Sequence, residues 1–153
     1  MRITDINCMI GNRNTRRRKF KTSDDLLAVL DQYRISDCVA YHSTTVWSPN
    51  RGNEIMKGIA EKSAGRIKAC YNLEPNLGSA VAPEADQLLY KLREEKPAAV
   101  RLEPASKRFR VDDFYCGELL EVLNELGMPV LFEADHIPGF DYLPTLAKTY
   151  PKI

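Results

Sequence analysis

The chain has 153 residues, of which 44% are hydrophobic and 28% charged, and it carries 22 Lys and Arg against 21 Asp and Glu. This composition is typical of one folded globular domain and excludes a disordered or collagen-like chain. No apolar stretch approaches the roughly 18–20 residues that span a bilayer, and the amino terminus lacks a secretory pattern, so we expect a cytoplasmic protein without a membrane partner.

Short apolar stretches alternate with amphipathic helical stretches along the chain. In chain order, we expect strands at 3–10, 37–43, 67–73, 98–102 and 129–133. We expect the first helix to begin with Ser23 as its N-cap. The later helices are expected to cover 52–64, 83–95, 117–126 and 142–150. Strands two to five recur about every 31 residues, which is the length of a βαβ unit with parallel strands.

Two α/β architectures are compatible with this rhythm. One is a (β/α)8 TIM-barrel-like fold of which the chain supplies about five βα units, as a single incomplete barrel domain. The other is a complete five-stranded doubly wound parallel sheet. In both, functional side chains lie beyond the carboxyl ends of the strands.

The first 22 residues are strongly basic. They hold seven Lys and Arg and one acid, a net charge of +6, whereas the remaining residues carry a net charge of −5. Such a segment attracts anions. Because it lacks interleaved aromatic side chains, we expect a small anionic molecule rather than nucleic acid as its partner.

The cysteines stand apart in the sequence, at Cys8, Cys38, Cys70 and Cys116. Without a Cys-x-x-Cys pair or a secretory signal, they are expected to be free thiols in a reducing compartment. The two histidines, His42 and His136, are not near paired cysteines, so structural zinc is not expected.

Polar residues on the expected strands are the candidate site residues. Alternation along the first strand places Asp5 and Asn7 on one face, where a buried strand obliges them to find partners. Arg101 and Glu103 share a face at the end of the fourth strand, and Glu133 ends the fifth. A buried Arg–Glu ion pair is the structural alternative to a functional role for these residues.

Four stretches carry a resemblance to the amidohydrolase-related (amidohydrolase family 2) metal-dependent hydrolases, which are (β/α)8 barrels. They are residues 3–11 (ITDINCMIG), 65–75 (GRIKACYNLEP), 99–104 (AVRLEP) and 126–133 (LGMPVLFE). The resemblance covers essentially the whole chain and implies that it corresponds to the first five-eighths of such a barrel.

The resemblance also implies where metal ligands would stand. The family's first-strand histidine pair falls on Asn7 and Met9, its strand-five histidine on Glu133, and its strand-four Lys and His on Arg101 and Glu103. An amide and a thioether are poor ligands for zinc or manganese, so we expect no metal and no other cofactor.

The sequence therefore predicts a divergent amidohydrolase-like protein that binds a small anion. If it catalyses a reaction, we expect hydrolysis or decarboxylation, with Asp5 or Glu133 as general base and Asn7, Arg101 and Glu103 binding the substrate. The alternative is a non-catalytic binding or interaction module on the same fold. Because five barrel units leave sheet edges unpaired, we also expect association with a second copy or with the missing half of a barrel.

Overall fold

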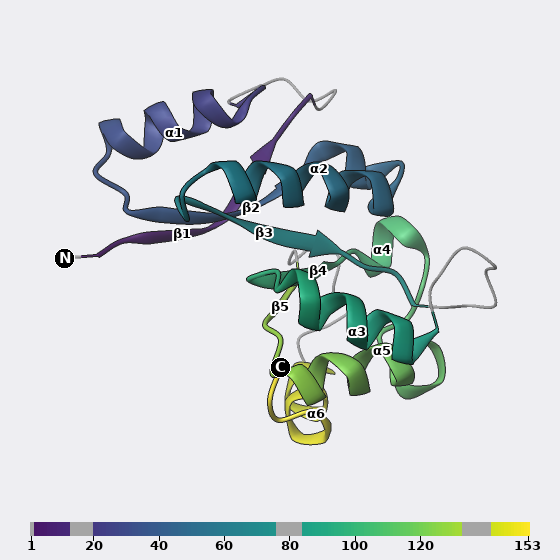
Figure 1. The fold of residues 1–153 in the computed structure, drawn as a ribbon. Coiled ribbons are helices and arrows are strands. Elements are labelled where there is room, and N and C mark those ends of the chain that lie inside the picture. The colour runs from purple at the N-terminus through teal and green to yellow at the C-terminus, as the bar shows by residue number, and fades with distance from the viewer. Residues whose placement is uncertain (1, 13–19, 76–83, 133–141) are drawn as a thin grey trace. The chain divides into compact units, whose positions relative to one another are not determined.

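A computed structural model describes residues 2–12, 20–75, 84–132 and 142–153 (Figure 1). The described elements divide into two compact units, Met1–Asn72 and Leu73–Ile153.

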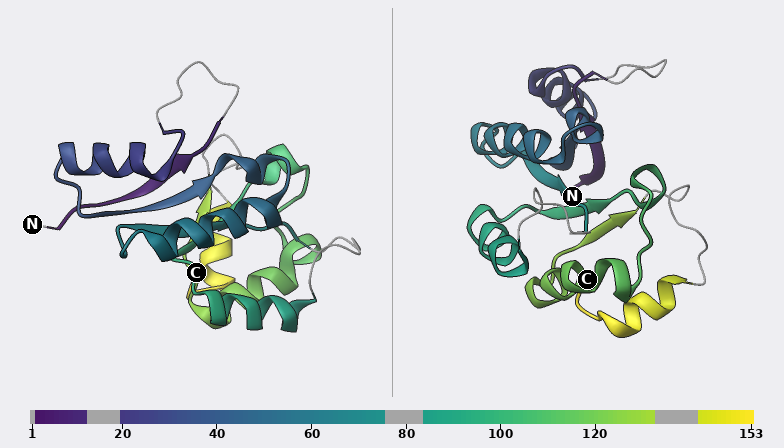
Figure 2. Two further views of the ribbon diagram at one scale, coloured as in Figure 1. Left: turned by 45° about the horizontal axis from the view of Figure 1, so that its top comes forward. Right: turned by 90° about the vertical axis from the view of Figure 1, so that its right-hand side faces the viewer.

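The first unit is a parallel sheet with helices on one face (Figures 1 and 2). Its elements are β1 (Thr4–Ile10), α1 (Ser23–Gln32), β2 (Asp37–His42), the short 3-10 helix η1 (Ser43–Val46), α2 (Pro49–Lys62) and β3 (Ile67–Asn72). Strand β2 lies between β1 and β3. Strands that are consecutive in the chain are thus neighbours in this sheet, as they are in a (β/α)8 barrel.

The second unit repeats the same pattern. Its elements are α3 (Ala85–Glu95), β4 (Ala99–Leu102), α4 (Pro104–Lys107), α5 (Asp113–Leu126), β5 (Val130–Phe132) and α6 (Tyr142–Thr149). Strands β4 and β5 are parallel, with Val100 opposite Val130. Helix α3 packs on α5, and the Tyr150 hydroxyl, just after α6, donates to Asp113 at 2.9 Å.

The core of each unit lies between strands and helices. In the first unit, Leu26 and Leu30 of α1 and Met56 of α2 are fully buried over the sheet. In the second, Leu120 and Leu123 of α5 are equally buried. No described helix has the length and apolar character needed to cross a membrane.

Helix starts differ from the sequence expectation because of local capping. The N-cap of α1 is Thr22, not Ser23: its hydroxyl accepts from the Asp25 amide, while the Asp25 carboxylate accepts from Thr22. Helix α2 begins earlier than expected, because Pro49 occupies its first turn, a position that proline favours. Helix α5 begins four residues early, since Asp112 caps it.

Strand β1 is less buried than expected. Residues 4–7 are exposed, and only Cys8 and Ile10 of this strand are buried. Ile3 and Ile6 remain 41% and 58% exposed. Exposed apolar groups on an edge strand are typical of a surface that associates with another strand or chain.

A buried carboxylate ties the amino ends of the strands together. Asp37 accepts from Arg2 at 2.7 Å, from Lys68 at 3.0 Å and from the Thr4 hydroxyl at 2.9 Å. The Arg2 guanidinium, followed by Lys68, lowers the pKa of Asp37 from 3.8 to about 2. These contacts pin β1 and β3 to the start of β2.

This carboxylate is expected to contribute to acid stability. Because its pKa is lower in the folded state, its contribution is complete above about pH 4 and is lost as the pH falls from 3.8 towards about 2. Asp37→Asn should unfold at a lower temperature than wild type at neutral pH and lose less further stability across this window. Thermal unfolding followed by circular dichroism at a series of pH values checks this, with the exposed Asp86→Asn as control. If the unfolding midpoints of wild type and Asp37→Asn fall in parallel as the pH is lowered, Asp37 does not contribute to acid stability in this way.

Candidate functional site

A buried ion pair marks the carboxyl end of β4. Arg101 is 1% exposed and Glu103 is 7% exposed, and Arg101 Nε lies 3.3 Å from Glu103 Oε1. This confirms that the two side chains share a face. The distance exceeds the 2.7–2.9 Å that is usual for charge-assisted contacts between nitrogen and carboxylate.

The chain around Arg101 holds it in place through its backbone. The Arg101 carbonyl accepts from the Leu73 amide at 3.2 Å. Pro104 then starts α4, and the Glu103 carbonyl accepts hydrogen bonds from the Lys107 backbone amide and from the Ser106 side-chain hydroxyl. The short strand and the helical turn after it thus fix both members of the ion pair.

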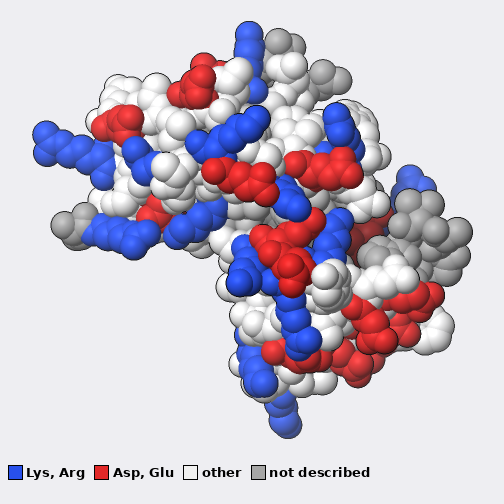
Figure 3. All heavy atoms as spheres, viewed as in Figure 1, with Lys and Arg blue, Asp and Glu red and all other residues white. Residues whose placement is uncertain are grey.

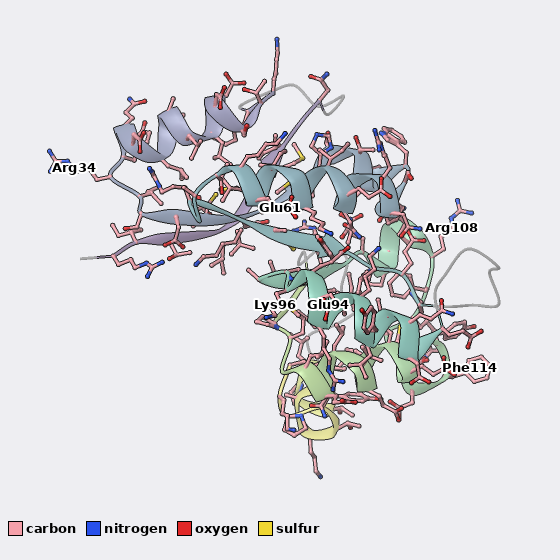
Figure 4. All side chains as sticks on the ribbon, in the orientation of Figure 1. Arg34, Glu61, Glu94, Lys96, Arg108 and Phe114 are labelled. Carbon is pink, nitrogen blue, oxygen red and sulfur yellow. The ribbon has the colours of Figure 1, made fainter. Side chains whose placement is uncertain are left out.

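Further cations follow in the same unit, and several are paired. Lys107 Nζ lies 2.7 Å from Glu74 Oε1, and Arg110 Nε lies 3.1 Å from Asp112 Oδ2. Arg108 projects outward from the end of α4 (Figure 4). On the face seen in Figure 3, Lys and Arg side chains are interspersed with Asp and Glu. Several of the described cations in this unit therefore lie beside acids.

The remaining predicted site residues differ in their surroundings. Asp5 and Asn7 lie in the first unit and are exposed, so the expectation of polar groups on a buried strand is wrong. Asp5 Oδ1 accepts from the Asn7 amide at 3.1 Å. Glu133 and the basic residues 13–19 lie outside the described residues.

A polar network that the sequence did not predict lies at the carboxyl ends of β2 and β3. Asn53 of α2 donates through Nδ2 to the Asn72 carbonyl, and its Oδ1 accepts from the Asn72 amide, both at 2.9 Å. Asn72 Nδ2 donates to the Thr45 hydroxyl at 3.0 Å, which donates to the His42 carbonyl at 2.8 Å. Asn53 and Asn72 are 2% and 3% exposed, so these bonds are shielded from water.

His42 ends β2 beside this network. Burial lowers the pKa of His42, which favours the neutral ring at neutral pH. Its Nδ1 accepts from the Thr44 amide at 3.2 Å, so the proton of the neutral ring is on Nε2. At Gly11, φ is +106°, and an added Cβ would lie 2.4 Å from Ser43 Oγ and 2.9 Å from His42 Nε2. Only glycine allows the end of β1 to approach β2 so closely.

The residues at the metal-ligand positions of the resemblance do not fit a zinc or manganese site. Asn7 and Met9 offer an amide and a thioether, and Arg101 places a cation at the end of β4, paired with Glu103. Among residues 2–12, 20–75, 84–132 and 142–153, no three His, Cys, Asp or Glu side chains are grouped to hold a metal.

Comparison with known proteins identifies the fold. No protein-family model and no curated protein matches the chain. Among solved structures, an uncharacterised TIM-barrel protein from Bordetella bronchiseptica is similar, with a TM-score of 0.66 and 12% sequence identity. The match covers 100% of this chain and 65% of the Bordetella chain.

Two other similar solved structures are named as enzymes. A probable 2-pyrone-4,6-dicarboxylic acid hydrolase from Acinetobacter baumannii, solved with citric acid bound, has a TM-score of 0.61 at 14% identity over 88% of this chain and 50% of its own. A dihydroorotase from Campylobacter jejuni has a TM-score of 0.55 at 15% identity over 97% of this chain and 45% of its own.

The chain thus spans between 45% and 65% of the lengths of these structures. At these identities the likeness establishes the fold alone. The chain has a TIM-barrel-like α/β fold.

Proposed function

We propose that this chain is an amidohydrolase-like protein that binds a small carboxylated molecule through Arg101. The observation that carries the proposal is a nearly inaccessible guanidinium, 1% exposed, at the carboxyl end of a strand in a TIM-barrel-like fold. In this fold the carboxyl ends of the strands carry the functional groups.

The chemistry of the ion pair supports an anionic ligand. A guanidinium binds carboxylates through paired N–H groups, and such bonds are stronger where water is excluded. The long contact with Glu103, at 3.3 Å, makes this acid a partner that a better-placed carboxylate can replace. The citric acid in the Acinetobacter structure is itself a polycarboxylate.

If the protein is an enzyme, the reaction we propose is metal-independent hydrolysis or decarboxylation of the bound carboxylate. Arg101 then holds the substrate in place of Glu103, and the candidates for the general base are those that the sequence predicts, Asp5 and Glu133. A general base must come within about 2.6–3.2 Å of the proton's donor. Exposure of Asp5 leaves its carboxylate accessible for this role.

The second candidate is a binding protein without catalysis on the same fold. It is favoured by the amide, thioether and guanidinium that stand at the family's metal-ligand positions. Proton release during incubation with a carboxylated lactone distinguishes the two: turnover supports the enzyme, and saturable binding alone supports the binding protein.

Thermal unfolding in the presence of a panel of anions tests the proposal. Citrate and succinate should raise the unfolding midpoint saturably, by about 5 °C when ligand greatly exceeds the dissociation constant. Chloride at the same ionic strength is the control, because it screens charge without bidentate binding. Equal shifts for citrate and chloride would overturn anion binding at Arg101.

A further inference from the structure

The acid beside Arg101 has few hydrogen-bond donors around it. Glu103 is 7% exposed, and a carboxylate has about four positions at which it accepts hydrogen bonds. Among the described residues, its side chain has one polar contact, with Arg101 Nε at 3.3 Å. Buried charges are normally surrounded by donors, because they lose their hydration. Glu103 therefore has unused acceptor positions next to the guanidinium that the proposed function assigns to the ligand.

The cations that follow in the chain do not fill these positions. Lys107 Nζ lies 2.7 Å from Glu74 Oε1, and Arg110 Nε lies 3.1 Å from Asp112 Oδ2. The backbone of Glu103 is also fixed, since its carbonyl accepts from the Lys107 amide at 3.0 Å. The Glu103 carboxylate therefore stays at the end of β4 and keeps its capacity for further donors.

Binding of a carboxylate to Arg101 makes this shortage greater. A ligand carboxylate that takes over the guanidinium leaves Glu103 buried without its cation, which is strongly unfavourable. It also brings a second negative charge close to the first. A ligand that carries an ammonium group as well as its carboxylate removes both difficulties, because it supplies N–H donors to Glu103 and leaves the net charge of the site unchanged.

We propose that the ligand is an amino-carboxylate, with its carboxylate bound by Arg101 and its ammonium bound by Glu103. This inference rests on the proposed function, because it takes a carboxylate at Arg101 as its starting point. The two residues are two apart at the end of β4, so their side chains lie on one face and can contact the two ends of one small molecule. One long ion pair is then replaced by two charge-assisted contacts.

Isothermal titration calorimetry at neutral pH with matched probes tests the proposal. The pairs are glycine with acetate, β-alanine with propionate, and γ-aminobutyrate with butyrate, and the members of each pair differ only in the ammonium group. At least one amino-carboxylate should bind about tenfold more tightly than its matched carboxylate, as expected for one charge-assisted hydrogen bond in a site shielded from water. If all three amino-carboxylates bind no more tightly than their matched carboxylates, the proposal is wrong.

Glu103→Gln preserves the shape of the side chain and removes its charge. This variant should lose the preference for the ammonium group and still bind the plain carboxylates. Glu74→Gln is the matched control, because Glu74 is 41% exposed at its side chain and already paired with Lys107, so this variant should keep the preference. Loss of the preference in Glu74→Gln but not in Glu103→Gln would overturn the assignment of the ammonium to Glu103. The wild-type comparison is decisive even where Glu103→Gln does not fold.

The same titrations separate this proposal from the proposed function. If the plain carboxylates bind as tightly as the amino-carboxylates, and Arg101→Met weakens both, the proposed function stands and the amino-carboxylate inference fails. If none of the six probes binds, or if Arg101→Met binds them as wild type does, the carboxylate site itself is absent and both proposals fail.

Discussion

Arg101→Met is expected to weaken binding of citrate and related carboxylates about tenfold or more. A charge-assisted bond to a buried cation contributes about 1.5–3 kcal/mol, and each 1.4 kcal/mol corresponds to about a tenfold change in affinity. Isothermal titration calorimetry of wild type and variant with citrate measures the loss. Arg108→Ala is the matched control, because Arg108 is exposed and projects outward from α4 (Figure 4), and this variant should bind like wild type.

The same substitution also leaves Glu103 buried without its cation, which costs about 3–5 kcal/mol of folding stability in comparable cases. The double variant Arg101→Met/Glu103→Leu separates the two effects. An apolar pair in place of a buried ion pair is often neutral or stabilising, so this variant should regain stability but not citrate binding. If it binds citrate as wild type does, Arg101 is not the anion contact.

Asn53→Leu should lower the free energy of unfolding by about 2 kcal/mol or more. It removes both hydrogen bonds to the Asn72 backbone and leaves a buried amide and carbonyl unsatisfied, at about 1–3 kcal/mol each. Urea denaturation measures the loss. Asn50→Leu, an exposed substitution on the same helix, should change the free energy little.

If Asn53→Leu and Asn50→Leu lower the free energy of unfolding equally, the polar network does not stabilise the ends of β2 and β3. A larger loss for Asn53→Leu with unchanged citrate affinity would instead separate this network from the proposed ligand site in the second unit.

Much of the fold was predictable from the sequence. The described strands begin and end within about one residue of expectation, because short apolar runs between turn residues are a strong local signal. The order of β1, β2 and β3 could not be derived this way, since a barrel and a doubly wound sheet share the same βα rhythm. The η1 and α4 turns were missed because single turns bury few apolar residues.

The candidate site was predictable only in part. Arg101 and Glu103 follow directly from alternation on a buried strand. The exposure of Asp5 and Asn7 was not foreseen, because sequence shows that a strand is apolar but not how many neighbours cover it. His42 and Asn72 end expected strands, a signal that could have identified them. The bulge between Asp5 and Cys8 changes the register of β1 without a sequence signal of its own.

The most direct measurement of the central claim is a ¹H–¹⁵N nuclear magnetic resonance titration of the arginine Nε–H groups with citrate. Each arginine gives its own resonance, and variants at Arg101 and Arg108 assign the two that matter. We predict that the Arg101 Nε–H resonance moves saturably as citrate replaces Glu103, while that of Arg108 stays in place. Movement of exposed arginines alone, in proportion to ionic strength, would contradict a buried anion site at the end of β4.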